Sequence, residues 1–275
     1  MLLSTYETHV HPDPNFPIIF HLDTCKHKSP LFIPHWHESL ELLYVVKGEC
    51  QTSSNGAIRS AKPGEVVIFS SNCIHAARPV GEKSSYYCLI IDKNFCDSFG
   101  VPIGEKQFAQ VVDDSRIRSC YQAIVQEMEE QGPYYKEEVK ALSLQLVIGC
   151  CRSFSVTPGG DIGSDSRRSE MVKEALGYLR AHFAEPVTVD QLCTHVGFSK
   201  YYFCREFKAL TGRTVVDYLN FLRCENARRL MASGRYNVSE SAAMSGFHSL
   251  SYFSRVYRKQ IGVLPSAGAE QKNLP

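Results

Sequence analysis

The pattern of hydrophobic and polar positions divides the chain into a β-rich part and a helical part. Between residues 16 and 92, short β-branched or aromatic segments alternate with Pro, Gly, Asn and Ser, as is typical of strands separated by turns. The Asn55-Gly56 pair predicts a hairpin turn. Many short strands predict a small barrel or sandwich. The expected strands are residues 17–23, 39–54, 64–70 and 85–92.

After residue 113 the hydrophobic positions follow a helical period. Two amphipathic helices are expected at residues 114–130 and 135–154, separated by the sequence QGP. Such a pair of helices packs either on its own β domain or on a second copy of the protein. Residues 155–168 are polar and rich in Gly and Ser, which predicts a flexible linker. Beyond the linker the pattern is helical almost to the end.

Two stretches of the helical part resemble each other, one starting at Thr188 and the other at Asn237. Each predicts a short helix that begins with a capping box, a glycine turn with positive φ, and a second helix capped by serine. A short helix, a tight turn and a longer helix form a helix-turn-helix motif. A helical hairpin packed only for stability is the alternative, and the duplication argues against it. The matching positions are Val189/Val238, Gly197/Gly246, Phe198/Phe247, Tyr202/Tyr252, Phe203/Phe253, Arg205/Arg255 and Gly212/Gly262, with the capping pairs Thr188–Gln191 and Asn237–Glu240 and the serines Ser199 and Ser249.

The segment between the two motifs is expected to be one helix, at residues 214–231. Eighteen helical residues span about 27 Å. Recognition helices that read successive turns of one DNA face lie about 34–36 Å apart. A connector of this length, together with the width of the motifs, would hold the second helices near that separation.

The distribution of charge along the chain suggests that the helical part binds a polyanion. Residues 169–275 contain 14 Lys/Arg against 9 Asp/Glu, whereas residues 1–168 contain 16 against 20. The basic half therefore favours a nucleic acid partner, with ordinary solvated surface charge as the alternative. The 11 cysteines include no C-x-x-C pair and no signal peptide is evident, which predicts reduced thiols in a soluble, cytoplasmic protein. No segment is long and apolar enough to predict a membrane span.

The last hundred residues resemble the DNA-binding region of AraC/XylS-type transcriptional regulators. The resemblance lies in VGFSKYYFCREFK, YLNFLRCENARRL and SGFHSLSYFSRVYRKQIGVLP. It implies sequence-specific binding of double-stranded promoter DNA, a homodimer, contact with RNA polymerase, and most often activation in response to a small molecule, frequently a carbohydrate. The tail SAGAEQKNLP lacks the Tyr-Arg that usually follows Pro265, so a short final helix is expected.

The exposed side of each second helix is expected to contact DNA. Arg205 and Arg255 are the candidates for guanine recognition; a phosphate contact or an intramolecular ion pair is the alternative for both. Arg258 and Lys259 are expected on phosphate, and Leu250 offers only an apolar contact to thymine. The full candidate set is Lys200, Tyr201, Cys204, Arg205, Lys208, Ser249, Leu250, Ser251, Ser254, Arg255, Arg258 and Lys259.

The sequence HWHESLELLYVVKG, from His35 to Gly48, resembles the first cupin motif, and GEVVIFSSNCIHAARP supplies His75 in the position of the second. On one continuous strand His35, His37 and Glu41 would face the same way. Three imidazoles and one carboxylate suit Fe, Mn, Ni or Zn. In the second motif, however, Pro79 stands where Asn is usual and Ser70 where Pro is usual.

The resemblance to AraC/XylS-type regulators favours an organic effector over a metal at this set, since such sensors often keep the histidines without an ion. A bound divalent metal and purely structural histidines stay open as alternatives. The expected effector-binding residues are His21, His35, His37, Glu41, His75, Arg78 and Tyr87.

The sequence thus predicts an α+β chain with a cupin-like barrel and an all-α domain of two helix-turn-helix motifs joined by a long helix. The expected function is a non-enzymatic regulator that needs no cofactor. A metal-dependent cupin enzyme or a metal or redox sensor, fused to a DNA-binding domain, is the alternative. The expected parts are a sensing domain at 1–112, a helical dimerisation segment at 113–154, a linker at 155–168 and a DNA-binding domain at 169–275.

Overall fold

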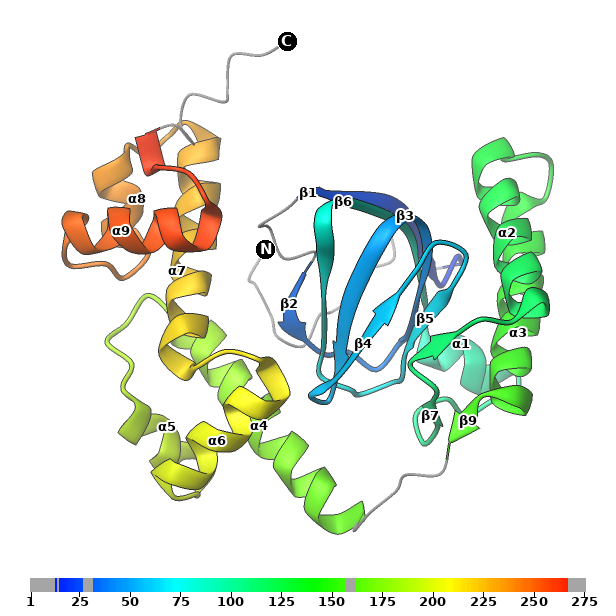
Figure 1. Ribbon diagram of the computed structural model, residues 1–275, viewed down its shortest axis with the longest axis horizontal. Coiled ribbons are helices and arrows are strands. Elements are labelled where there is room, and N and C mark those ends of the chain that lie inside the picture. Colours follow the sequence, from blue (N-terminus) through cyan, green and yellow to red (C-terminus); the bar gives the residue numbers. More distant parts are fainter. Residues whose placement is uncertain (1–12, 14, 27–31, 157–161, 267–275) are drawn as a thin grey trace. The chain divides into compact units, whose positions relative to one another are not determined.

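The computed structural model describes residues 13, 15–26, 32–156 and 162–266. The chain separates into two compact units, with the boundary after Ser169. The first unit contains the strands and helices α1 to α3, and the second is entirely helical (Figure 1). Among the described residues no helix could cross a membrane. The tail beyond residue 266, where a short final helix was expected, lies outside the described part.

The first unit is built on a seven-stranded sheet with the order β1-β6-β3-β5-β8, in which β2 pairs with β6 and β4 with β3. The long strands β3 and β6 pair antiparallel from Leu40↔Ile91 to Ser54↔His75. The predicted turn at Asn55-Gly56 joins β3 to β4, and both residues have positive φ. The strands are β1 (Ile18–Lys26), β2 (Phe32–His35), β3 (Leu40–Ser54), β4 (Ala57–Ala61), β5 (Val66–Phe69), β6 (His75–Ile91) and β8 (Val111–Val112).

A bulge bends the sheet in the middle of its longest strand pair. The register between β3 and β6 shifts between Val45 and Glu49. Gly48 lies in this bulge with φ +73°, and a Cβ there would come within 2.2 Å of the carbonyl oxygen of Lys83. Only glycine allows both the positive φ and this close approach. The bulge increases the local twist, which lets the two long strands curl.

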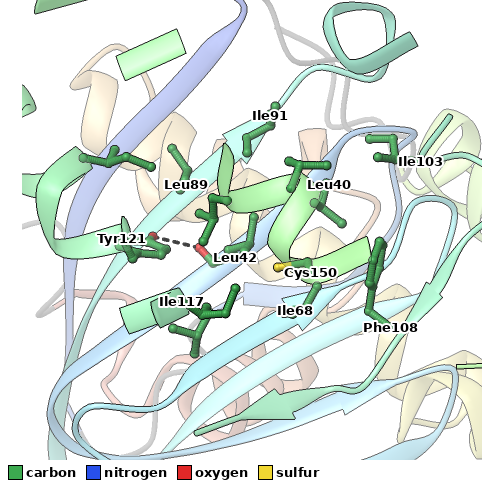
Figure 2. Packing of buried hydrophobic residues seen from close by; sticks show 14 of the residues in the cluster. Leu40, Leu42, Ile68, Leu89, Ile91, Ile103, Phe108, Ile117, Tyr121 and Cys150 are labelled. Carbon is green, nitrogen blue, oxygen red and sulfur yellow. Dashed lines mark hydrogen bonds between the residues drawn. The ribbon is translucent and has the colours of Figure 1, made fainter. Parts of the chain in front are cut away.

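The two faces of the sheet have separate cores. Leu43, Val45 and Cys88 belong to the inner face. Leu40, Leu42 and Leu89, of the opposite parity, pack under helices α2 (Ser115–Glu130) and α3 (Tyr135–Ser153), as Figure 2 shows. The remaining elements of this unit are the short helix α1 (Lys93–Ser98) and the strand pair β7 (Gln107–Phe108) and β9 (Ser155–Val156).

Helices α2 and α3 match the predicted segments and bury the predicted stripes against their own sheet. Ile117, Tyr121 and Ile124 of α2 are buried, as are Val139 and Leu146 of α3. Asp114 caps α2 by accepting from the backbone N–H of Arg116 and Ile117. The sequence allowed these helices to pack either on their own β domain or on a second copy of the protein. The buried residues show that they pack on the β domain of the same chain.

The buried Tyr121 fastens α2 to the sheet. Its hydroxyl contacts the carbonyl oxygens of Leu42 (3.0 Å, Figure 2) and Tyr87 (2.9 Å). Tyr121→Phe should lower the free energy of unfolding of this unit by about 0.5–1.5 kcal/mol, because one buried hydrogen bond is lost. Urea unfolding followed by the fluorescence of Trp36, the single tryptophan, measures this.

A matched control for Tyr121→Phe is Gln122→Ala. The side chain of Gln122 donates to the hydroxyl of Tyr44 at an exposed position, so its loss should change stability by less than about 0.5 kcal/mol. An equal effect of the two substitutions would contradict the role given to Tyr121.

In the second unit, two pairs of helices lie at opposite ends of α7 (Figure 1). Both predicted capping boxes are present, and Gly197 and Gly246 have φ of +74° and +84°. Both predicted serines are N-cap residues: Ser249 accepts from the N–H of Tyr252, whereas the side chain of Ser199 makes no capping hydrogen bond. The helices are α4 (Ile162–His182), α5 (Val189–Val196), α6 (Lys200–Thr211), α7 (Val215–Ser233), α8 (Val238–Met244) and α9 (Leu250–Ile261).

The expected flexible linker needs correction. Ser155 and Val156 form β9 with β7, and α4 already begins at Ile162. Residues 157–161 lie outside the described part. Ser, Asp and Arg cost a helix only tenths of a kcal/mol each, so the polar sequence that predicted a linker is compatible with the first turns of α4.

Candidate DNA interface and buried histidine cluster

Each helix-turn-helix motif holds its second helix on a packed aromatic core. In the first motif, Phe203 and Phe207 of α6 are fully buried. In the second, Phe253 and Tyr257 of α9 take the same places and pack with Phe247. These buried positions fix which side of each helix faces away from the core.

The opposite side of α6 carries the predicted contact residues. Lys200, Tyr201, Arg205 and Lys208 are exposed, whereas Cys204 is half-buried. The spacing i, i+1, i+4, i+5 and i+8 places all five on one face of the helix.

Arg205 is held by a neighbour on its own helix. Its Nε lies 2.7 Å from Oε1 of Glu206, which is buried, and this pairing raises the pKa of the guanidinium. The guanidinium also lies 5.3 Å from the ring of Tyr202. The intramolecular ion pair considered for Arg205 therefore exists. Because this ion pair uses Nε of Arg205, the two outer nitrogens of the guanidinium take no part in it.

The corresponding face of α9 is also exposed, with Ser249, Leu250, Ser251 and Arg255 open to solvent and Ser254 half-buried. The guanidinium of Arg255 lies 5.5 Å from the ring of Tyr252. Further along the helix, Arg258 and Lys259 are exposed. The Nζ of Lys259 lies 3.1 Å from Oδ1 of Asp217 on α7.

Two helix-turn-helix motifs, each presenting an exposed cationic face on its second helix, are the arrangement with which proteins enter the major groove. The described fold and these faces define the class of protein as a DNA-binding regulator.

In the first unit, four predicted residues converge on the inner face of the sheet. His35 ends β2, His37 lies in the link to β3, Glu41 lies in β3, and His75 begins β6. Their potential ligand atoms all lie within 4.8 Å of one another, and each residue is 5% exposed or less. The convergence that the sequence predicted is therefore present.

The reason given for the convergence was wrong. His35, His37 and Glu41 do not share one continuous strand, because β2 ends at His35 and β3 begins at Leu40. Instead, the loop before β6 holds the link in place: the N–H of Asn72 donates to the carbonyl oxygen of His37 (2.8 Å). His35 meets His75 as its cross-strand partner, with ring centroids 4.3 Å apart.

The hydrogen bonds of His37 and His75 place both rings between acceptors. Nδ1 of His37 lies 3.0 Å from the carbonyl oxygen of Ser39, and Nδ1 of His75 lies 2.9 Å from that of Cys73. Nε2 of each ring lies 3.0–3.1 Å from Oε2 of Glu41. A neutral imidazole donates from only one nitrogen, so a neutral ring in this position satisfies only one of its two acceptors.

The protonation states of the cluster differ between its members. Burial lowers the pKa of His37 to about 4, although Glu41 opposes the effect. Burial also disfavours the charge on His75, but Cys73 and Glu41 raise its pKa to about 10. Hydrogen bonds from the two histidines outweigh burial and hold the pKa of Glu41 well below its usual range. At neutral pH the carboxylate is thus charged, His75 is charged, and His37 is neutral.

The donor set and its surroundings fit a divalent transition metal ion. Three imidazoles and one carboxylate are ligands that such ions accept. In metal sites the histidine nitrogen that does not bind metal commonly donates to a backbone carbonyl, as Nδ1 of His37 and of His75 can do here. With Nδ1 donating to its carbonyl oxygen, Nε2 of each of these two rings would be available to a cation near Oε2 of Glu41.

The other three predicted effector residues do not join the cluster. His21 is exposed on the edge strand β1, where its Nε2 lies 3.0 Å from Oδ2 of Asp23. Arg78 is exposed on β6. Tyr87 faces α2, where its hydroxyl donates to Oε1 of Glu129 (2.6 Å). Arg78 follows the inward-facing Ala77 on one side of the bulge in β6, and Tyr87 lies between the inward-facing Tyr86 and Cys88 on the other, so both side chains point away from the cluster.

Sequence reasoning missed Cys88, whose Sγ lies 3.6 Å from Oε1 of Glu41. From the sequence it had no expected role beyond that of a reduced thiol. Its alternation with Tyr86 and Ile90 marks it as inward-facing, but only the register between β6 and β3 brings it next to Glu41. Two cavities lie elsewhere in this unit: one of about 650 Å³ between α1 and α3, with Phe95 and Lys140 in its wall, and one of about 230 Å³ between α2 and α3.

Comparisons with known proteins agree with both units. Residues 192–271 match the family described as "Helix-turn-helix domain", and residues 24–147 match "AraC-like ligand binding domain". The chain therefore belongs to the AraC-type transcriptional regulators and has the ligand-binding domain of that family.

Individual relatives agree with this assignment. The "HTH-type transcriptional activator RhaR" of Pectobacterium atrosepticum is 27% identical over 252 residues, which cover 88% of this chain and 87% of that protein. The "Regulatory protein PocR" of Salmonella typhimurium is 32% identical over 102 residues, covering 37% of this chain and 34% of that protein. Both are regulators by name, which favours the regulator over the enzyme alternative.

Among solved structures, ToxT from Vibrio cholerae O395 has the same fold, with a TM-score of 0.50 and 14% sequence identity. The match covers 94% of this chain and 99% of that one. The predicted fold class, a sheet-rich domain followed by a helical domain with two helix-turn-helix motifs, is confirmed.

Proposed function

We propose that this protein activates transcription at promoters recognised by α6 and α9, and that a ligand of the first unit controls this binding. The exposed Arg205 and Arg255 at equivalent places of two helix-turn-helix motifs are the observation on which the proposal depends. The name of the RhaR relative supports activation. The ligand-binding domain supports control by a small molecule.

One candidate effector for the first unit is a carbohydrate. Polar groups in an otherwise apolar sheet interior are what a sugar pocket requires, and His37, Glu41 and His75 lie among apolar residues of the inner face. An organic ligand at this place must open the packing, because the cluster is almost fully buried.

A divalent transition metal ion is the second candidate, and one observation favours it for the cluster itself. His37 lies between two acceptors, the carbonyl oxygen of Ser39 and the carboxylate of Glu41. An ion held by His35, His37, Glu41 and His75 would need no widening of the site, since the ligand atoms already lie within 4.8 Å of one another. Such an ion would supply a positive charge that links β2, β3 and β6.

Thermal unfolding of the purified protein with sugars and with Zn²⁺, Mn²⁺, Fe²⁺ or Ni²⁺ separates the two classes. A ligand at a hundred times its dissociation constant should stabilise the folded protein by about 2.7 kcal/mol. We expect one of the metal ions to do so, and to change the affinity for selected DNA. His37→Ala and Glu41→Gln should abolish both effects, because each removes one ligand.

His21→Ala is the matched control, since it removes an exposed histidine of the same unit that lies outside the cluster. It should leave the stabilisation by metal unchanged. If a sugar stabilises the protein and His37→Ala abolishes that effect while no metal binds, the cluster is an organic pocket. If neither class of ligand changes DNA binding, the proposed control by the first unit is wrong.

We also propose that two copies pair and that the DNA-bound protein contacts RNA polymerase. Resemblance to AraC/XylS-type regulators supports both. Helices α2 and α3, which the sequence suggested for dimerisation, remain the proposed site of pairing.

A further inference from the structure

One residue bridges the C-terminal ends of the two recognition helices. Arg213 follows α6 directly after Gly212, the C-terminal cap of that helix. Its backbone N–H donates to Oγ1 of Thr211 (3.2 Å), and the Thr211 hydroxyl lies 3.1 Å from the carbonyl oxygen of Arg213. The backbone of Arg213 is thus tied to the last turn of α6.

The side chain of Arg213 reaches the other helix. Its Nη1 donates to Oε1 of Gln260, in the last turn of α9, over 3.0 Å. The guanidinium lies 4.9 Å from the ring of Phe221 on α7. Burial lowers the pKa of this guanidinium, although Tyr218 and Asp217 oppose the effect. Arg213 therefore spans from the end of α6, across α7, to the end of α9.

Other polar contacts fasten α9 to α7. Nδ2 of Asn220 donates to the hydroxyl of Tyr252 (3.0 Å), and Lys259 pairs with Asp217. These contacts fix the second motif on the connector. The Arg213–Gln260 hydrogen bond adds a second kind of link, because it joins the residues between α6 and α7 to α9.

The separation of the two helices must be held closely if they read one DNA molecule. One base pair more between two half-sites moves them ~3.4 Å apart along the axis. It also rotates them by about a tenth of a turn, because half-sites one helical turn apart are about 10–10.5 base pairs apart. A connector helix sets the distance between its ends, whereas the rotation of each motif about that helix depends on side contacts.

A half-buried guanidinium is a costly way to gain stability alone. Burying a charge against a neutral amide contributes less than a well-packed apolar side chain of similar size. The planar fork of arginine fixes direction as well as distance, which lysine does not. These properties suit a bond whose role is to define geometry.

We propose that Arg213 is a positioning residue that sets the spacing and rotation of α6 relative to α9, and thereby the half-site spacing that the protein accepts. The inference rests on the proposed reading of DNA by both helices. It adds a specificity determinant that makes no contact with DNA.

The test uses the full chain and the DNA site that the wild type selects from a random pool, together with versions in which the two half-sites are one or two base pairs closer or further apart. We expect the wild type to prefer its selected spacing over the neighbouring ones by about tenfold, as for one mismatched base pair. Arg213→Ala and Gln260→Ala should reduce this preference to less than about threefold. The base preference within each half-site should be unchanged.

Conservative and neighbouring variants separate positioning from mere stability. Gln260→Glu keeps an acceptor for Nη1 and should retain the spacing preference. Arg258→Ala, two residues away on α9, should weaken binding by the same factor at every spacing, because it removes an exposed charge of the proposed phosphate contact and leaves the Lys259–Asp217 pair in place.

The positioning role would be overturned if Arg213→Ala lowered the affinity for DNA by the same factor at every half-site spacing and left the preference for the selected spacing unchanged. If Arg213→Ala fails to fold, Gln260→Ala and Gln260→Glu decide the question in the same way. A wild type that selects no paired half-sites would instead refute the reading of DNA by both helices, so the two failures are distinguishable.

Discussion

Gly246→Ala is expected to destabilise the second helix-turn-helix motif by about 2–5 kcal/mol. Gly246 follows α8 with φ +84°, a conformation that costs an alanine about 1–2 kcal/mol. In addition, its Cβ would lie 2.7 Å from the carbonyl oxygen of Ala184, which belongs to the backbone after α4. A backbone atom cannot move aside as a flexible side chain can. Hydrogen exchange of the amides of α8 and α9 in urea measures the loss directly.

Gly197→Ala is the matched control for this prediction. Gly197 holds the equivalent place in the first motif with φ +74°, but no atom lies within 4 Å of its added Cβ. It should therefore show only the backbone cost of about 1–2 kcal/mol. Equal losses at the two glycines would contradict the importance given to the contact with Ala184. Gly246→Ala should also remove contacts to one half-site while those of α6 persist.

The combined substitution of Arg205 and Arg255 by alanine is expected to have the largest effect on specificity. Each arginine should contribute about 1–3 kcal/mol to the discrimination between target and scrambled DNA. The two sites lie in different motifs, so their effects should add to about 2–6 kcal/mol. Nε of Arg205 donates to Glu206, so the two outer nitrogens of the guanidinium are the ones expected to contact a base.

Competition binding with target and scrambled DNA measures this discrimination. Arg235→Ala is the control: it removes an exposed arginine between α7 and α8 that lies outside both recognition helices. It should lower the affinity for both DNAs by similar small factors. If Arg205→Ala leaves discrimination unchanged, Arg205 contacts phosphate rather than bases.

The helix-turn-helix motifs could be predicted because their signals are local. The capping boxes at Thr188 and Asn237 and the glycines at 197 and 246 lie within a few residues of the ends they define. The start of α4 could not be predicted in this way. Residues 162–168 are mostly Gly, Ser, Asp and Arg and resemble a linker, so the sequence pattern did not separate the first turns of the helix from the loop before it.

The geometry of the histidine cluster, in contrast, depends on contacts between residues far apart in the sequence. Its four members were predicted from spacing, yet the strand that was to align them is interrupted at residues 36–39. Tyr87 and Arg78 were assigned to the site, but the bulge in β6 changes which positions face inward, and both residues alternate with inward-facing neighbours. The Arg213–Gln260 bond joins residues that are 47 positions apart, and no local pattern marks such a pair. The spacing of residues along the sequence suggests which side chains can meet. Strand register and long-range contacts then determine which of them do.

A chemical footprint of the intact protein on the DNA it selects tests the central claim most directly. We expect two protected half-sites, centred about 10–10.5 base pairs apart on one face of the duplex. Arg205→Ala should remove protection in one half-site and Arg255→Ala in the other. A single footprint that Arg255→Ala leaves intact would contradict the claim that both motifs read DNA.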